Sequence, residues 1–245
     1  MKRIACLVLL FVMSACSRKA EEVRIGVDPS FFPLEIQGKE ANVFAFTTEL
    51  LQEIGDLEKI RFERVTTSWD NLLWGLQEHQ YVAALSALDK YVFNTAKYSF
   101  SEMYLATGPV LVVPGNASIT SFADLSGCVV TVEGEEAAKY VLSQDPSILV
   151  QVYTTFAQAL EEVNQGTAAA AMLPCIPAIA YVNNIYSGQL KIISRPLMDQ
   201  GLRLVTTKDA QPALIKKFNT GLRQLQESGR LAELKQKWDL EPKLN

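Results

Sequence analysis

The stretch VVTVEGEEAAKYVL, residues 129–142, combines a β-branched strand pattern, one glycine and the start of a helix. A helix start exposes free backbone N–H groups and the positive end of the helix dipole, so it favours an anion. Two acids, Glu135 and Glu136, occupy the first predicted turn of this helix. The stretch therefore indicates an α/β fold and leaves two interpretations open: the helix start binds a ligand, or Glu135 caps it from within the chain.

Strand and helix patterns alternate on both sides of this stretch. A new unit begins at PVLVVPG (109–115), and the chain returns to the first unit at about 195–204. This order predicts mostly parallel sheets with helices on both faces. We therefore predict two α/β lobes joined by two crossing strands. The predicted boundaries are 23–108 and 197–245 for the first lobe and 109–196 for the second, with helices at 45–55, 69–79, 155–166 and 213–240, the last broken at Ser228-Gly229.

Composition and charge exclude several functions. The chain has 245 residues, 49% of them apolar and 20% charged, as expected of an ordinary globular protein. Its 23 Lys and Arg against 27 Asp and Glu form no basic cluster, so no nucleic-acid partner is expected. His79 is the only histidine, and no phosphate-loop signature is present, so no metal, cofactor or catalytic site is predicted.

The N-terminus MKRIACLVLLFVMSAC predicts export. Its apolar run, residues 4–13, is too short to span a bilayer but has the length of a signal-peptide core. The small residues before Cys16 resemble the box of bacterial lipoprotein signals, with Met13 where leucine is usual. We expect residues 1–15 to be removed, Cys16 to carry lipid and 16–22 to form a tether; an ordinary secretory signal is the alternative.

Two further cysteines remain after processing. Cys128 opens one predicted strand, whereas Cys175 follows the end of another. If those strands are parallel, about five residues at roughly 3.3 Å each separate the two thiols. That separation exceeds the Cα distance of about 7 Å that a disulfide tolerates. We therefore predict no disulfide.

Several motifs resemble the extracellular solute-binding proteins of amino-acid ABC importers, family 3, which have the type II periplasmic-binding-protein fold. The resemblance covers nearly the whole mature chain, and its last two motifs are the most specific. It implies an exported, membrane-tethered monomer that delivers a small solute to an ABC permease. The matching segments are GVDPSFFPLE (26–35), WDNLLWGLQEHQYVAALSAL (69–88), YSFSEMY (98–104), SFADLSGCVVTVEG (121–134) and LRQLQESGRLAELKQKW (222–238).

The residues that grip an amino acid in that family are replaced here. The resemblance implies an arginine on the ligand carboxylate, a hydroxyl after the glycine of the second-lobe helix start, and an acid on the ligand ammonium. The aligned positions hold Asn94, Glu135 after Gly134, and Pro174. Because a charged hydrogen bond contributes roughly 1.5–3 kcal/mol, these changes argue against the usual pose of a free amino acid.

Other residues can replace the three ligand contacts that these changes remove. Asp28, Asp89 and Glu135 predict an acidic pocket, and Phe31 and Trp69 lie where relatives place the residues that sandwich the ligand. The hypothesis is a cationic or uncharged solute with an apolar part, held by stacking or cation–π contact. Its pocket also includes the loop residues Ser86, Ala87 and Leu88.

Each of these residues also has a structural interpretation. Asp28 can cap a turn, Phe31 and Trp69 can belong to the core, and Asp89 can pair with Lys90 on the surface. For Phe32, beside Pro33, a core position is favoured. The leading function is a solute receptor of an ABC importer. The alternatives are an accessory protein with a decayed pocket and a small dehydratase on the same scaffold.

Overall fold

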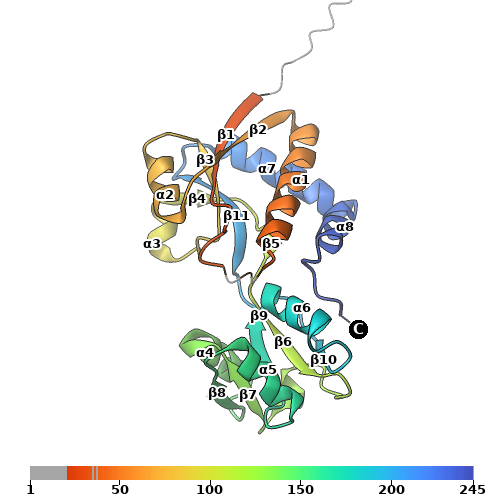
Figure 1. Ribbon diagram of the computed structural model, residues 1–245. Helices are drawn as coiled ribbons and strands as arrows, with labels where there is room; N and C mark the ends of the chain where they lie inside the picture. Colours follow the sequence, from red (N-terminus) through yellow and green to blue (C-terminus); the bar gives the residue numbers. More distant parts are fainter. Residues whose placement is uncertain (1–20, 35, 37, 245) are drawn as a thin grey trace, which may run out of the picture.

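The computed structural model describes residues 21–34, 36 and 38–244, and it confirms the predicted α/β class. The chain forms two β-sheets, each with helices on both faces (Figure 1). We call each sheet with its helices a lobe. The predicted signal segment and Cys16 lie outside the described residues.

The first lobe is built on a six-stranded sheet in the order β2-β1-β3-β11-β4, with β5 also paired to β11. Strand β1 is parallel to β2 and β3, whereas β11 is antiparallel to its neighbours. Helices α1, α7 and α8 bury apolar side chains in one core, and α2 contributes to a second, smaller core. The strands are β1 (Glu21–Val27), β2 (Ile60–Thr66), β3 (Ala83–Ser86), β4 (Tyr98–Phe100), β5 (Leu105–Ala106) and β11 (Gly201–Thr207), and the helices are α1 (Glu40–Glu58), α2 (Trp69–Gln77), α3 (Val92–Thr95), α7 (Pro212–Glu227) and α8 (Arg230–Lys237).

The second lobe is built on a five-stranded sheet in the order β10-β6-β9-β7-β8. Strand β7 is parallel to β8 and β9, whereas β6 is antiparallel to β9 and β10. Helices α5 and α6 pack on one face and α4 on the other. The elements are β6 (Pro109–Pro114), the 3-10 turn η1 (Phe122–Leu125), β7 (Val129–Val132), α4 (Gly134–Gln144), β8 (Leu149–Val152), α5 (Phe156–Asn164), β9 (Ala170–Pro174), α6 (Cys175–Asn184) and β10 (Leu190–Ile192).

Two local predictions need correction, and two are confirmed. The helix predicted at 45–55 begins at Glu40 and ends at Glu58, because Lys59 rather than Gly55 takes the left-handed conformation that ends it. Helix α6 was not predicted at all. The break between α7 and α8 is confirmed at Gly229, which has φ +80°. Cys128 and Cys175 are both free thiols, as predicted.

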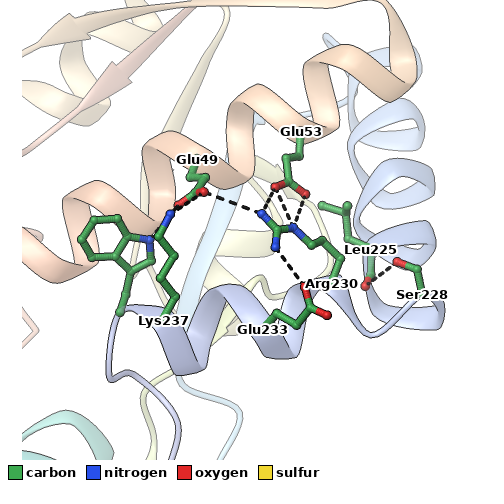
Figure 2. A network of polar contacts seen from close by, with 8 residues as sticks. Glu49, Glu53, Leu225, Ser228, Arg230, Glu233 and Lys237 are labelled. Atoms are coloured by element: carbon green, nitrogen blue, oxygen red, sulfur yellow. Dashed lines mark hydrogen bonds and ion pairs between the residues drawn. The ribbon is translucent and has the colours of Figure 1, made fainter.

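A network of charges fixes the closing helix α8 on α1 (Figure 2). The Arg230 guanidinium donates to both carboxylate oxygens of Glu53, with Nε to Oε1 at 2.9 Å. Lys237 and the Trp238 indole donate to Glu49, and the Lys237 hydrogen bond is the main cause that lowers the pKa of the Glu49 carboxyl. Helices far apart in the sequence are thereby held together.

The two lobes are joined where the outgoing and returning segments cross. The backbone N–H groups of Thr107 and Gly108 both donate to the carbonyl of Gln200, at 2.9 and 3.1 Å. The N–H of Leu197 donates to the Pro109 carbonyl at 2.9 Å. A Cβ atom on Gly108 would lie 2.7 Å from the backbone oxygen of Met198. The crossing is therefore too close for any side chain at position 108.

Gly108→Ala is expected to lower the free energy of unfolding by about 1–3 kcal/mol, because the added methyl forces the crossing segments apart. Urea unfolding of the variant measures this loss. Gly221→Ala in α7 is the matched control, since its Cβ would meet a side-chain atom of Ile54 at 3.0 Å rather than backbone at 2.7 Å, and alanine favours a helix. Equal stabilities of the two variants would contradict the proposed tightness of the crossing.

Candidate functional site

The carboxyl ends of β1 and β3 carry the predicted site residues of the first lobe. Asp28, directly after β1, is 7% exposed. Its Oδ1 accepts hydrogen bonds from the Ser30 N–H at 2.9 Å and the Ser30 hydroxyl at 2.7 Å. Asp28 therefore caps the turn after β1, as its structural interpretation expected.

The aromatic residues Phe31, Phe32 and Trp69 divide between the core and an exposed ring contact. Phe31 is 3% exposed and belongs to the core of the first lobe. The preference for Phe32 as a core residue is wrong, because its side chain is 55% exposed. The Phe32 ring instead makes an edge-to-face contact with the half-buried Trp69, at 5.8 Å between centroids. The accessible aromatic pair is thus Phe32 with Trp69.

The loop after β3 is held by its own polar groups. The Ser86 hydroxyl accepts from the Leu88 N–H at 3.1 Å, and Ala87 is buried. Asn94, in α3, donates through Nδ2 to the Asp89 carbonyl at 2.9 Å. Asn94 is only 7% exposed, so this buried amide fixes the loop that carries Asp89.

The Asp89 carboxyl is half-buried and surrounded by charges from both lobes. Burial is the main cause that raises its pKa, and the carboxyl groups of Glu136 and Asp199 raise it further, while the Arg203 guanidinium opposes them. The pKa of the Tyr91 phenol is also raised, first by Asp89 and then by Glu136. Glu136, from α4 of the second lobe, and Asp89, from the first lobe, therefore both raise the pKa of the same phenol, Tyr91.

The start of α4 carries two acids, Glu135 and Glu136, in different surroundings. Gly134 begins the helix with φ +72°. Glu135 points to solvent with a side chain 81% exposed, and its carboxylate pairs with Lys139 at 2.6 Å. Glu136 instead lines a small pocket of about 90 Å³ that Pro174 shares; the other lining residues are Pro109, Glu133, Ala137, Met172, Met198 and Gln200.

Arg203 is a residue of this region that sequence analysis missed. It lies in β11 opposite Ser86 of β3 and is 1% exposed. Its Nη2 pairs with Asp199, while Nε and Nη1 are buried without a hydrogen-bond partner among the described residues. An arginine within the apolar strand GLRLVTT was the available signal, because such a residue is rarely buried unpaired.

The described residues provide neither a metal-binding cluster nor a membrane-spanning helix. Within residues 21–34, 36 and 38–244, no group of three or more His, Cys, Asp or Glu side chains is arranged to hold a metal ion. In the same part of the chain, no helix combines the length and apolar character that a bilayer crossing requires.

Two α/β lobes with charged groups converging between them define a two-lobed solute-binding protein. The family model for bacterial extracellular solute-binding proteins, family 3, matches residues 23–241. The chain therefore belongs to this family, whose members capture solutes for import, and it is an exported protein of the amino-acid ABC transporter class.

Relatives of known type agree with this assignment. A probable amino-acid ABC transporter-binding protein of Haemophilus influenzae is 25% identical, over 90% of this chain and 85% of its own. The arginine-binding extracellular protein of Bacillus subtilis is 23% identical, over 94% and 93%. The unliganded open L-cystine solute receptor of Neisseria gonorrhoeae has a TM-score of 0.71 at 20% identity, covering 91% and 94%. The structural likeness establishes the type II periplasmic-binding-protein fold.

Glu136→Gln is expected to lower the pKa values of Asp89 and Tyr91, because it removes a negative charge that opposes their ionisation. Titration of the Asp89 carboxyl and the Tyr91 phenol by NMR measures both shifts. Glu135→Gln is the matched control, since Glu135 is exposed and paired with Lys139. Equal shifts in both variants would contradict the electrostatic interaction between Glu136 and Asp89.

Proposed function

We propose that this protein captures a small organic cation between its two lobes and delivers it to an ABC permease. The observation that carries the proposal is that Glu136 of the second lobe lies near enough to Asp89 of the first to raise the pKa of its carboxyl. With Asp199, three carboxyl groups meet one guanidinium, Arg203, which already pairs with Asp199. Such an excess of negative charge attracts a cation and disfavours an anion.

The aromatic pair supplies the apolar part of the proposed pocket. Phe32 and Trp69 follow β1 and β2 at the same edge of the first sheet as the Asp89 loop. An exposed aromatic face attracts a cation and packs against its apolar stem. We propose that the solute lies between this pair and the acids, bounded by residues 86–89 and Asn94 on one lobe and by Gly134, Glu136 and Pro174 on the other.

Lobe closure is the proposed means of capture. The boundaries we propose are 23–108 with 197–245 for the first lobe and 109–196 for the second. A cation placed between Asp89 and Glu136 attracts both acids and offsets their mutual repulsion, so binding favours the closed arrangement of the lobes over the open one. Two relatives support a cationic solute, since the Bacillus subtilis and Mannheimia haemolytica proteins are named arginine-binding.

Cationic amino acids and polyamines are expected to raise the unfolding temperature, whereas glutamate and aspartate leave it unchanged. At a hundredfold excess over the dissociation constant, the stabilisation is about 2.7 kcal/mol. For a chain of this length that corresponds to a rise of about 5–10 °C. Thermal unfolding of residues 17–245, which include every residue that the structure describes, measures the rise.

Asp89→Asn and Glu136→Gln are expected to weaken the response to cations at least tenfold, and Glu135→Gln to preserve it. Stabilisation by anionic amino acids alone would overturn the cationic assignment. No stabilisation by any compound would favour the accessory protein with a decayed pocket. Turnover of a cyclic acid in a coupled assay would favour the dehydratase; we propose that the protein has no enzymatic activity.

We also propose that Cys16 carries lipid and tethers the protein as a monomer to a membrane. Cys16→Ala is expected to abolish incorporation of radiolabelled palmitate and to release the protein from the membrane fraction. The supporting feature is the box of small residues before Cys16. Export of an unlabelled, soluble wild-type protein would favour the ordinary secretory signal. Sedimentation of residues 17–245 tests the monomer.

A further inference from the structure

A second pocket lies on the other side of the crossing from the proposed solute site. Helices α3 and α4 stand on one side of the crossing, and α6, α8 and the C-terminal segment stand on the other (Figure 1). The pocket there, which we call the rear pocket, has a volume of about 840 Å³. Its lining comes from β5, the start of α6, the returning segment, α8 and residues 239–244.

Cationic side chains dominate the rear pocket. Arg195, Lys235 and Lys243 line it, together with the acids Asp239 and Glu241. Asp239 is already occupied, because its carboxylate accepts from Lys39 at 2.5 Å and from Asn183 at 3.3 Å. Three cations therefore share the pocket with one remaining acid.

Lys235 is the unusual member of this group. Burial lowers the pKa of its ammonium, and Glu241 and the Cys175 thiol oppose that effect while Arg195 adds to it. Among the described residues, none of the three cations forms a hydrogen bond or an ion pair within 4 Å. A half-buried ammonium that lacks such partners is incompletely solvated, so a bound anion would stabilise it.

Glu241 supplies a hydrogen-bond acceptor within the same pocket. Its Oε2 is buried and has no hydrogen-bond partner in the described part of the chain. A carboxylate can only accept, so an anion bound beside it must still carry a proton to form a hydrogen bond with it. Inorganic phosphate near neutral pH keeps an O–H, because its third ionisation lies far above neutral pH, whereas a phosphate monoester has only two ionisations and loses its last O–H near a pH of about 6. Sulfate carries no such proton.

We propose that the rear pocket is a second ligand site, for inorganic phosphate. Lys235, Arg195 and Lys243 bind the phosphate oxygens by charge-assisted hydrogen bonds, and Glu241 accepts from the phosphate O–H. The rear pocket is distinct from the small pocket that Glu136 and Pro174 line, since no side chain lines both.

The position of the rear pocket links its occupant to both lobes. Asp239 follows α8 of the first lobe, and its partner Asn183 lies in α6 of the second. The side chain of Ile176, also in α6, is buried in the core of the first lobe. A phosphate bound beside these contacts touches both lobes, so it stabilises one lobe arrangement over the other.

Calorimetric titration of residues 17–245 with inorganic phosphate and with sulfate tests the site. We expect saturable phosphate binding, with sulfate at least tenfold weaker. Lys235→Met and Arg195→Gln are expected to weaken phosphate binding at least tenfold. Lys216→Met is the matched control, because it removes the same charge from an exposed position on α7 and is expected to change the affinity less than twofold.

The outcomes separate this site from the proposed solute site. Phosphate binding lost in Lys235→Met and Arg195→Gln but kept in Glu136→Gln supports the rear site, whatever the cationic ligand proves to be. Absence of saturable binding, or unchanged affinity in Arg195→Gln, which replaces an exposed side chain and preserves the core, would overturn it. Sulfate binding as tightly as phosphate would overturn the role of Glu241.

Discussion

The close crossing of two backbone segments is the constraint on which the rest of the structure depends. Gly108 lies so near the backbone of Met198 that the segments pack without side chains between them. Thr107 and Gly108 share one acceptor, the carbonyl of Gln200, so both segments are held at one point. Since the chain enters the second lobe and leaves it through this crossing, a charged residue within it, Asp199, is placed between the lobes.

The fold was predictable because its signals are periodic and local. Strands, helices and the return of the chain follow from residue patterns that repeat every two or three to four positions. Helix α6 escaped prediction because its segment, CIPAIAYVNN, is apolar almost throughout and carries Pro177. A proline in the first turn is compatible with a helix, but the pattern lacks the alternation that identifies an exposed face.

The site was less predictable, because adjacent residues on a helix point about 100° apart. Glu135 and Glu136 have the same chemistry and are both exposed, and only the packing of α4 decides that Glu136 lines the pocket beside Pro174 while Glu135 pairs with Lys139. The same limit applies to Phe31 and Phe32. A core position was favoured for Phe32, but Phe31 is the buried neighbour, because the turn after β1 decides which of the two rings points into the core. Residue type was informative in both cases, whereas side-chain direction required the three-dimensional structure.

The buried Arg203 sets the balance of charge near Asp89. A guanidinium buried with two unpaired nitrogens is costly, and Asp199 alone compensates only one of its edges. Asp89 lies close enough for the guanidinium to oppose the rise of its pKa. Asn94 holds the Asp89 loop, and the Arg203 guanidinium lies buried in β11 of the same sheet. The carboxyl groups of Asp89, Glu136 and Asp199 therefore outnumber the one guanidinium that acts on Asp89, which leaves an excess of negative charge there.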